Sequence, residues 1–206
     1  MDLVSSWVHG WALCRSVGAP EAVPGAWRME VGLPGHRVRY VLPAFDEQVL
    51  DGLGREHDAP GTWIKVAGEP ELLRKALPGA WAMADTAYLM QVPFRAGEKV
   101  GHPVRVVRDG PVVHAEILGE GGERAAWGRM APAGTVGVID QVETDPGHRR
   151  RGFGSAVMRT LADAALDLGL STGVLAATAD GRALYQALGW SVAGPLAAAH
   201  VPEAHI

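Results

Sequence analysis

The segment from Asp145 to Ser155 contains the residues best suited to bind a ligand. It reads Asp-Pro-Gly-His-Arg-Arg-Arg-Gly-Phe-Gly-Ser and lies between a strand-like stretch and an amphipathic helical pattern. N–H groups at the start of a helix attract anions, and glycine lets the backbone approach them closely. Consecutive arginines add positive charge where phosphates would bind. We therefore expect a pyrophosphate site made of Arg149, Arg150, Arg151, Gly152, Phe153, Gly154 and Ser155.

Four other interpretations of this segment compete with this site. The arginines could form a solvated patch or contact nucleic acid, but a nucleic-acid site draws on a wider basic surface and this chain has a net charge of −4. The dinucleotide pattern Gly-x-Gly-x-x-Gly is absent because residue 157 is Val. A Walker loop is absent too, since no Gly-Lys-Ser/Thr follows.

The elements around this segment predict a mixed α/β sheet. An apolar stripe at helical spacing indicates a helix at residues 154–168, and a second helix is expected at 181–188. Strands are expected at 104–108, 112–118, 124–130, 135–144, 173–178 and 190–193.

The first half of the chain predicts a further α/β region. Helices are expected at residues 4–15, 46–53 and 70–77. Strands are expected at 27–32, 37–42, 62–67 and 86–92. The Gly-, Pro- and charge-rich stretch 93–103 is the expected boundary, which divides the chain into regions 1–96 and 97–206.

Two motifs together resemble the GNAT superfamily of N-acetyltransferases. The first is Arg-x-x-Gly-x-Gly over residues 149–154, and the second is Leu-Tyr-Gln-Ala-Leu-Gly-Trp over residues 184–190, where the family has Leu-Tyr-x-x-x-Gly-Phe. The resemblance covers residues 104–195 and hardly extends to 1–95. It implies a GNAT-like acetyltransferase domain at 97–206 behind an N-terminal α/β extension, with acetyl-CoA as the acyl donor and no metal.

The resemblance also implies roles for individual residues. Backbone groups of Val142, Glu143 and Thr144 would bind the pantetheine arm and an oxyanion, and Thr178 stands where many members have a pantetheine-binding Asn. Tyr185 matches the tyrosine that protonates the departing CoA thiolate.

No general base is assigned from the sequence. Histone-modifying members have a glutamate at the position that aligns with Val138, and Asp140 and Glu143 are the nearest carboxylates. A histone-type mechanism is therefore not expected.

The implied reaction is direct transfer of an acetyl group, through a tetrahedral intermediate, to the primary amine of a small molecule. The alternative is a non-catalytic acyl-CoA-binding or regulatory module that kept the fold.

The role of region 1–96 stays open. Residues 63–81 and 174–190 share a faint strand, helix, Leu, Gly, Trp pattern, in which Arg74 takes the place of Tyr185. Region 1–96 is accordingly either a unit on the acceptor side or a degenerate GNAT-like half, which would have lost cofactor binding and would close the acceptor side of the cleft. Its tryptophans either fill a core or line an acceptor pocket.

Composition excludes several other classes of protein. The chain is 48% hydrophobic, and its single cysteine, Cys14, rules out an internal disulfide and is expected in the core. The eight histidines lack metal-ligand spacing. Neither a signal peptide nor a membrane span is apparent, so we expect a cytoplasmic protein without membrane or nucleic-acid partners. A homodimer is left open.

Overall fold

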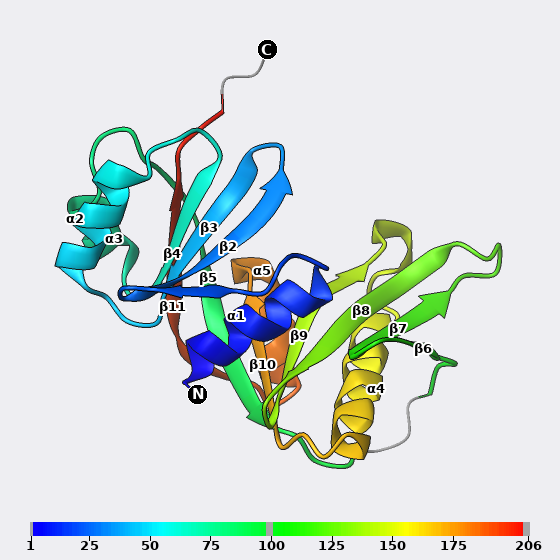
Figure 1. The fold of residues 1–206 in the computed structure, drawn as a ribbon. Coiled ribbons are helices and arrows are strands. Elements are labelled where there is room, and N and C mark those ends of the chain that lie inside the picture. Colours follow the sequence, from blue (N-terminus) through cyan, green and yellow to red (C-terminus); the bar gives the residue numbers. More distant parts are fainter. Residues whose placement is uncertain (1, 98–100, 204–206) are drawn as a thin grey trace.

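Both halves of the chain contribute to one mixed α/β sheet (Figure 1). The computed structural model describes residues 2–97 and 101–203. Eleven strands from these residues lie in the order β1-β2-β3-β4-β11-β5-β10-β9-β8-β7-β6. The strands are β1 (Glu21–Val23), β2 (Ala26–Leu33), β3 (His36–Leu42), β4 (Thr62–Ala67), β5 (Ala82–Pro93), β6 (Arg105–Asp109), β7 (Val112–Leu118), β8 (Arg124–Ala133), β9 (Val136–Thr144), β10 (Thr172–Ala177) and β11 (Ser191–His200).

The helices cover both faces of this sheet. They are α1 (Leu3–Cys14), α2 (Glu47–Glu56), α3 (Pro70–Ala76), α4 (Phe153–Asp167) and α5 (Ala179–Ala187), with a 3-10 turn at Pro146–His148. Helix α4 packs on one side of the second half, whereas α1 crosses the other side of the sheet where the two halves meet (Figure 1).

Most of the predicted elements are confirmed, and the main difference is the length of β11. The sequence predicts a strand that ends at residue 193, because Gly194-Pro195 resembles a turn and the following alanines favour strands weakly. In the structure the register shifts at Val192/Gly194, and β11 then continues to His200. A β-bulge therefore takes the place of the expected turn.

Two central strands are exchanged between the halves. Strand β11 pairs antiparallel with β4 of the first half, whereas β5 of the first half pairs antiparallel with β10 of the second. The element order β2-β3-α2-β4-α3-β5 is the same as β8-β9-α4-β10-α5-β11. In both series the third strand runs parallel to the second. This common arrangement supports the faint internal repeat.

The boundary at residues 96 and 97 stays a prediction. Residues 98–100, within the expected linker 93–103, lie outside the described residues. Strand β5 precedes that linker and pairs with β10 beyond it, so the two predicted regions share one sheet.

Cys14 lies in the core as predicted, whereas the tryptophans of region 1–96 divide between buried and partly exposed positions. Trp7, Trp11 and Trp81 are buried, whereas Trp27 and Trp63 are partly exposed. Burial raises the pKa of the Cys14 thiol to about 12, which makes it a poor nucleophile. None of the helices in the described part of the chain is long and apolar enough to cross a membrane.

Helix α1 approaches the sheet closely because residue 10 is glycine. A Cβ atom built on Gly10 would lie 2.3 Å from the Cβ of Val138 in β9. Both residues are buried, and the contact fixes the distance of α1 from β9. The glycine therefore provides close packing at the cost of helix propensity.

We expect Gly10→Ala to lower the free energy of unfolding by about 1–3 kcal/mol, the usual effect of overpacking a core. The matched change Gly52→Ala lies inside α2, where a built Cβ would have no atom within 4 Å. It should raise stability by about 0.5–1 kcal/mol, because alanine favours a helix. Urea unfolding of both variants measures the difference, and equal effects would contradict the packing role of Gly10.

Candidate functional site

The start of α4 presents unpaired backbone N–H groups. Gly152 is the N-cap residue and adopts φ 80°, a left-handed conformation that favours glycine, with no side chain capping the helix. Ala156 N–H bonds the Gly152 carbonyl at 3.0 Å, whereas the N–H groups of Phe153, Gly154 and Ser155 have no acceptor within the described chain. This arrangement, together with the helix dipole, is suited to bind a phosphate.

The preceding loop has a defined shape and carries the three arginines. Asp145 Oδ1 accepts a hydrogen bond from Gly147 N–H at 2.9 Å. Arg149 Nε donates to the Thr144 carbonyl at 3.3 Å, and the Arg151 guanidinium lies 4.9 Å from the Phe153 ring centroid. All three arginines are exposed, so their charges can reach a ligand at the start of α4.

Beside this loop, β9 and β10 diverge. They pair in parallel at residues 136–138 with 172–174, and no further, although β9 continues to Thr144 and β10 to Ala177. The later part of β9 therefore has backbone groups without a strand partner on its β10 side. Such groups can bind the amides of an extended ligand, as an added strand would.

A β-bulge accompanies the divergence. Between Asp140 and Glu143, β9 contains one more residue than the facing stretch of β8, and Gln141 within it adopts φ 53°. Val142 packs against the core beside α4, and the Glu143 side chain is exposed. A Cβ built on Gly154 would lie 3.3 Å from Thr144 Oγ1, so β9 ends close to the start of α4.

Tyr185 of α5 lies on the same side of the sheet as α4. Its side chain is only 9% exposed, and it packs in the core cluster that α4 completes. Burial, and secondarily the charge of Asp140, raise the pKa of Tyr185 to about 12, so the phenol stays protonated at neutral pH. Its hydroxyl has no hydrogen-bond partner among the described residues.

Thr178 has a structural role that its resemblance to a pantetheine-binding position did not predict. It is the N-cap of α5, and its Oγ1 accepts a hydrogen bond from Gly181 N–H at 3.1 Å. The hydroxyl proton remains available for donation. The signal for this cap was present, because a Thr directly precedes the helical stretch.

The two nearby carboxylates differ in their surroundings. Both oxygens of Asp140 bind the guanidinium of Arg15, the C-cap residue of α1, at 2.6 Å to Nε and 3.3 Å to Nη2. Val138, at the family's glutamate position, is buried beneath Gly10. Glu143 is exposed, so its carboxylate would be solvated. The contribution of Arg15 had no signal in the sequence, because it lies 125 residues from Asp140.

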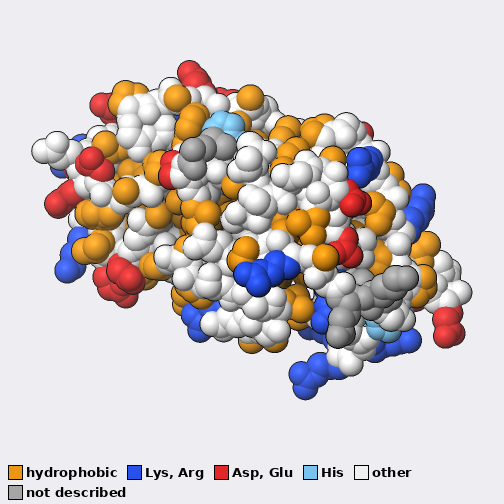
Figure 2. All heavy atoms as spheres, turned by 90° about the horizontal axis from the view of Figure 1, so that it is seen from below, with side chains coloured by type: hydrophobic (Ala, Val, Ile, Leu, Met, Phe, Trp, Pro, Cys, Tyr) orange, Lys and Arg blue, Asp and Glu red, His pale blue; other side chains and the backbone are white. Residues whose placement is uncertain are grey.

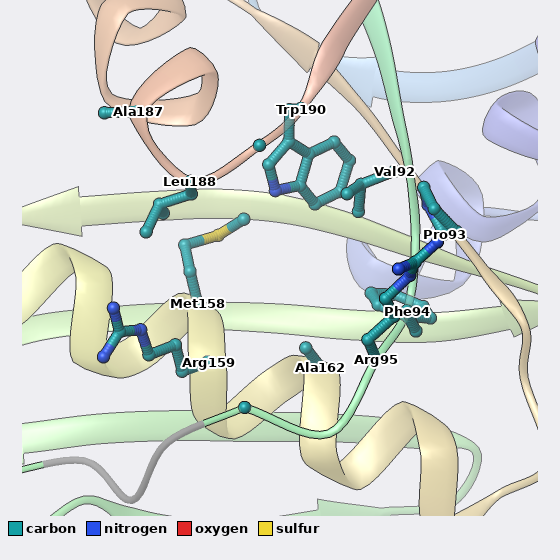
Figure 3. A pocket seen from close by; sticks show the side chains of 12 residues that line it. Val92, Pro93, Phe94, Arg95, Met158, Arg159, Ala162, Ala187, Leu188 and Trp190 are labelled. Atoms are coloured by element: carbon teal, nitrogen blue, oxygen red, sulfur yellow. The ribbon is translucent and has the colours of Figure 1, made fainter.

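A cavity of about 460 Å³ lies on the α4 side of the sheet (Figure 3). In Figure 3, Met158 of α4 points toward Leu188 and Trp190, which follow α5, and Phe94 lies at the end of β5. Its lining includes neither Tyr185 nor any residue of loop 145–152, and we assign it no role in the chemistry.

Basic side chains do not form a broad surface on the face seen in Figure 2. Lys and Arg side chains there occur singly or in small groups, separated by acidic, apolar and uncharged ones. The described part of this face therefore lacks the wide basic footprint that nucleic-acid binding requires.

These features agree with the comparisons with known proteins. The model of the acetyltransferase (GNAT) family matches residues 71–190, which is more than half of the chain. The chain therefore belongs to the GNAT family of acetyltransferases. Members of this family are acyl-CoA N-acyltransferases in general, so membership implies an acyl-CoA cosubstrate. A search of curated proteins finds no match.

Solved structures share the fold over both halves. A GCN5-related N-acetyltransferase from Kribbella flavida superposes with a TM-score of 0.68 at 14% identity, over 100% of this chain and 98% of that one. One from Sphaerobacter thermophilus has a TM-score of 0.59 at 14% identity, with 88% and 78% covered. A GCN5-related N-acetyltransferase-like protein from Streptococcus suis has a TM-score of 0.58 at 14% identity, with 89% and 88% covered. At this identity the likeness concerns the fold alone.

Proposed function

We propose that this protein transfers an acetyl group from acetyl-CoA directly to the primary amine of a small molecule. The observation that carries the proposal is the unpaired helix start at Gly152 next to the divergence of β9 and β10. A phosphate site and an open strand edge lie there side by side, and acetyl-CoA contains a pyrophosphate and an extended arm with two amides. When bound, it supplies an activated acyl group as a thioester.

In this proposal the loop and the start of α4 bind the pyrophosphate. The N–H groups of Phe153, Gly154 and Ser155 donate to its oxygens, and Arg149, Arg150 and Arg151 neutralise its charge. The open side of Gly152 supports this role, because a Cβ built there would have only His102 Nε2 within 4 Å, at 3.5 Å.

The open edge of β9 orients the pantetheine arm. Backbone groups of Val142, Glu143 and Thr144 bind the amides, and an N–H group of the same stretch stabilises the oxyanion that forms when an amine attacks a thioester. Thr178 can add a hydroxyl donor from the opposite strand end while its oxygen caps α5.

Tyr185 donates its hydroxyl proton toward the leaving sulfur. A phenol with a pKa of about 12 holds its proton at neutral pH, as an acid must, but it is a weaker acid than a free phenol. The driving force therefore comes from neutralising a thiolate in a buried site, where an uncompensated charge is costly.

The proton of the acceptor ammonium has no evident protein base. The carboxylate of Asp140 is paired with Arg15, and the carboxylate of Glu143 is exposed. We propose that the ammonium loses one proton to solvent before it enters, and that the second proton, which the nitrogen releases as the amide forms, restores the proton that Tyr185 gives to the sulfur. The lack of an evident base among the described residues also favours the second candidate, a non-catalytic acyl-CoA-binding module.

Thiol release from acetyl-CoA with a panel of primary amines tests the proposal. We expect CoA formation that requires both the protein and an amine, with no release when the amine is omitted. Saturable acetyl-CoA binding without release for any amine would favour the non-catalytic module. Absence of binding at millimolar acetyl-CoA would reject both candidates.

A further inference from the structure

Cationic and aromatic side chains gather on the α1 face of the sheet, between the first half and β9. The cationic cluster, as we call it, consists of Arg15 at the C-cap of α1, His36 and Arg39 of β3, and Lys65 of β4. The Arg39 guanidinium lies 4.0 Å from the ring centroid of Trp11 in α1. Strands β3 and β4 are parallel neighbours in which Arg39 is in register with Trp63, and Lys65 lies two residues further along β4 on the same face.

Arg39 is buried without an acidic partner. It is 6% exposed, and its Nε donates to His36 Nε2 at 3.0 Å, but its Nη1 has no hydrogen-bond partner among the described residues. Burial, and secondarily the charge of Arg15, lower the pKa of Arg39 to about 9. A buried guanidinium with an unpaired N–H is costly, so a partner from outside the described chain is expected.

Lys65 adds a second unpaired cation. Its ammonium has no hydrogen-bond or ion-pair partner in residues 2–97 and 101–203, and burial followed by the charge of Arg39 lowers its pKa to about 7. Asp140 is the carboxylate that acts on Arg39, yet both of its oxygens already bind Arg15. The cluster therefore has an excess of positive charge at neutral pH and below.

Aromatic rings border the cluster. Trp63 of β4 stacks on His200 of β11 at 4.6 Å and lies 5.1 Å from the His36 ring. The Nδ1 atom of His200 is buried and also has no partner in the described chain. Unpaired buried polar atoms are rare in native proteins and mark places where a ligand or water binds. Lys65, His36 and Trp63 are partly exposed, so a ligand can reach them.

The cluster adjoins the reactive end of the proposed acyl-CoA site. Asp140 of β9 binds Arg15, and the guanidinium groups of Arg15 and Arg39 lie 5.4 and 4.0 Å from the ring centroid of Trp11. Asp140 also lies two residues beyond Val138, where the pairing of β9 with β10 stops. An acceptor bound at the cluster would therefore be next to the divergence of the two strands.

We propose that the acceptor amine carries an oxyanion, a carboxylate or a phosphate, that binds Arg39 and Lys65. This inference rests on the function proposed above. A guanidinium presents paired donors to such a group and an ammonium adds a point charge. The rings of Trp11 and Trp63 offer apolar surface to the rest of the acceptor.

The kinetic test uses pairs of amines that differ only in the anion. Phenylalanine is compared with phenethylamine, and phosphoethanolamine with ethanolamine, which separates the carboxylate from the phosphate source. We expect the anionic member of at least one pair to have a kcat/KM about 10-fold or more above its neutral partner. Lys65→Met should remove most of that advantage by raising KM, with kcat/KM for the neutral amine changed less than about 2-fold.

Matched variants separate this effect from a loss of folding. Arg39→Met should act as Lys65→Met does, and Arg39→Lys, which keeps the charge, should recover part of the preference. Lys75→Met and Arg74→Met make the same substitutions at exposed positions of α3 and should leave the preference unchanged. If Arg39→Met fails to fold, the effect of Lys65→Met on the preference for anionic amines is the test of the proposal.

A binding experiment is independent of turnover. N-acetylphenylalanine and O-phosphoethanolamine are titrated calorimetrically, with N-acetylphenethylamine as the neutral control. Affinity for the anions should fall about 10-fold in Lys65→Met but should persist in Gly152→Val, which alters only the helix start. Anion binding without any thiol release would disprove the acetyltransferase and leave the anion site intact.

The anion affinity should also depend on pH. Lys65 is cationic below its pKa of about 7 and loses its charge above it, so binding weakens as pH rises through 7. The charged and titratable groups nearest to it are Arg39, whose charge acts on Lys65, and His36, on which Lys65 acts, both from β3. The elements packed beside them add Arg15 after α1, Asp140 of β9 and His200 of β11. Burial lowers the pKa of His36 to about 3, so it stays neutral over this range. Lys65→Met should abolish the pH dependence.

Two results together would overturn the proposal. The first is that Lys65→Met and Arg39→Met affect anionic and neutral amines equally, and the second is that anionic and neutral probes bind equally well.

Discussion

Tyr185→Phe should lower kcat by ~10²–10⁴ and leave the affinity for acetyl-CoA nearly unchanged. The substitution keeps the ring that packs against Trp190 and removes only the hydroxyl, which bonds no described residue. The fold should therefore survive. Affinity should persist because the N–H groups at the start of α4 and the edge of β9 are intact. A loss in kcat alone is the signature of an interaction made in the transition state.

The measurement combines steady-state thiol release with a separate titration of acetyl-CoA. Tyr40→Phe is the matched control, because Tyr40 is a buried tyrosine of the first half that stacks on His57. It should leave kcat unchanged. If Tyr185→Phe turns over within a factor of about two of the parent while chemistry limits the rate, the phenol is not the acid. Tyr185 would then be a core residue on the inner face of α5.

The second large effect concerns Gly152, whose replacement by Val should abolish acetyl-CoA binding. A side chain at this position would project into the space that the pyrophosphate needs, and a non-glycine residue at φ 80° adds about 1–2 kcal/mol of strain. In the parent protein, acetyl-CoA at 100 times its Kd should stabilise the fold by about 2.7 kcal/mol. This corresponds to a rise in Tm of roughly 5–10 °C.

Gly169→Val provides the control for this prediction. Gly169 follows the other end of α4, adopts φ 74°, and has no atom within 4 Å of a built Cβ. Its substitution imposes the same backbone strain without touching the candidate site. Both variants should lose similar stability, but only Gly152→Val should lose the acetyl-CoA shift. A full shift in Gly152→Val would place the phosphates elsewhere.

The phosphate loop could be predicted from sequence because its parts are contiguous. A strand, a Gly- and Arg-rich loop and an amphipathic helix follow one another between residues 135 and 168, and short-range geometry brings the loop to the helix start. The helix with Tyr185 was equally local. These roles remain predictions, although the structure places the residues around one helix start and one strand end.

The cluster that we propose as the acceptor side could not be predicted, because its parts come from distant segments. Arg15 directly follows an N-terminal helix, Arg39 lies in a strand of the first half and Asp140 lies in a strand of the second. Each looks like an ordinary charged residue in its own segment. Gly10 resembles a helix breaker in the sequence, and only its distance from Val138 explains it. The exchange of strands between the halves could not be predicted for the same reason, because the sequence pattern of a strand does not identify the strand with which it pairs.

The exchanged strands also constrain how the chain can acquire its structure. Leu196 of β11 pairs with Ala67 of β4. When β4 has been synthesised, more than 100 further residues must follow before its partner strand exists. During that interval the edges of β4 and β5 are unsatisfied and open to pairing with other chains. The high sequence separation implies slow folding that is completed only after β11 inserts. Nascent chains of this protein would therefore be expected to need protection from aggregation, and neither half should be stable as an isolated fragment.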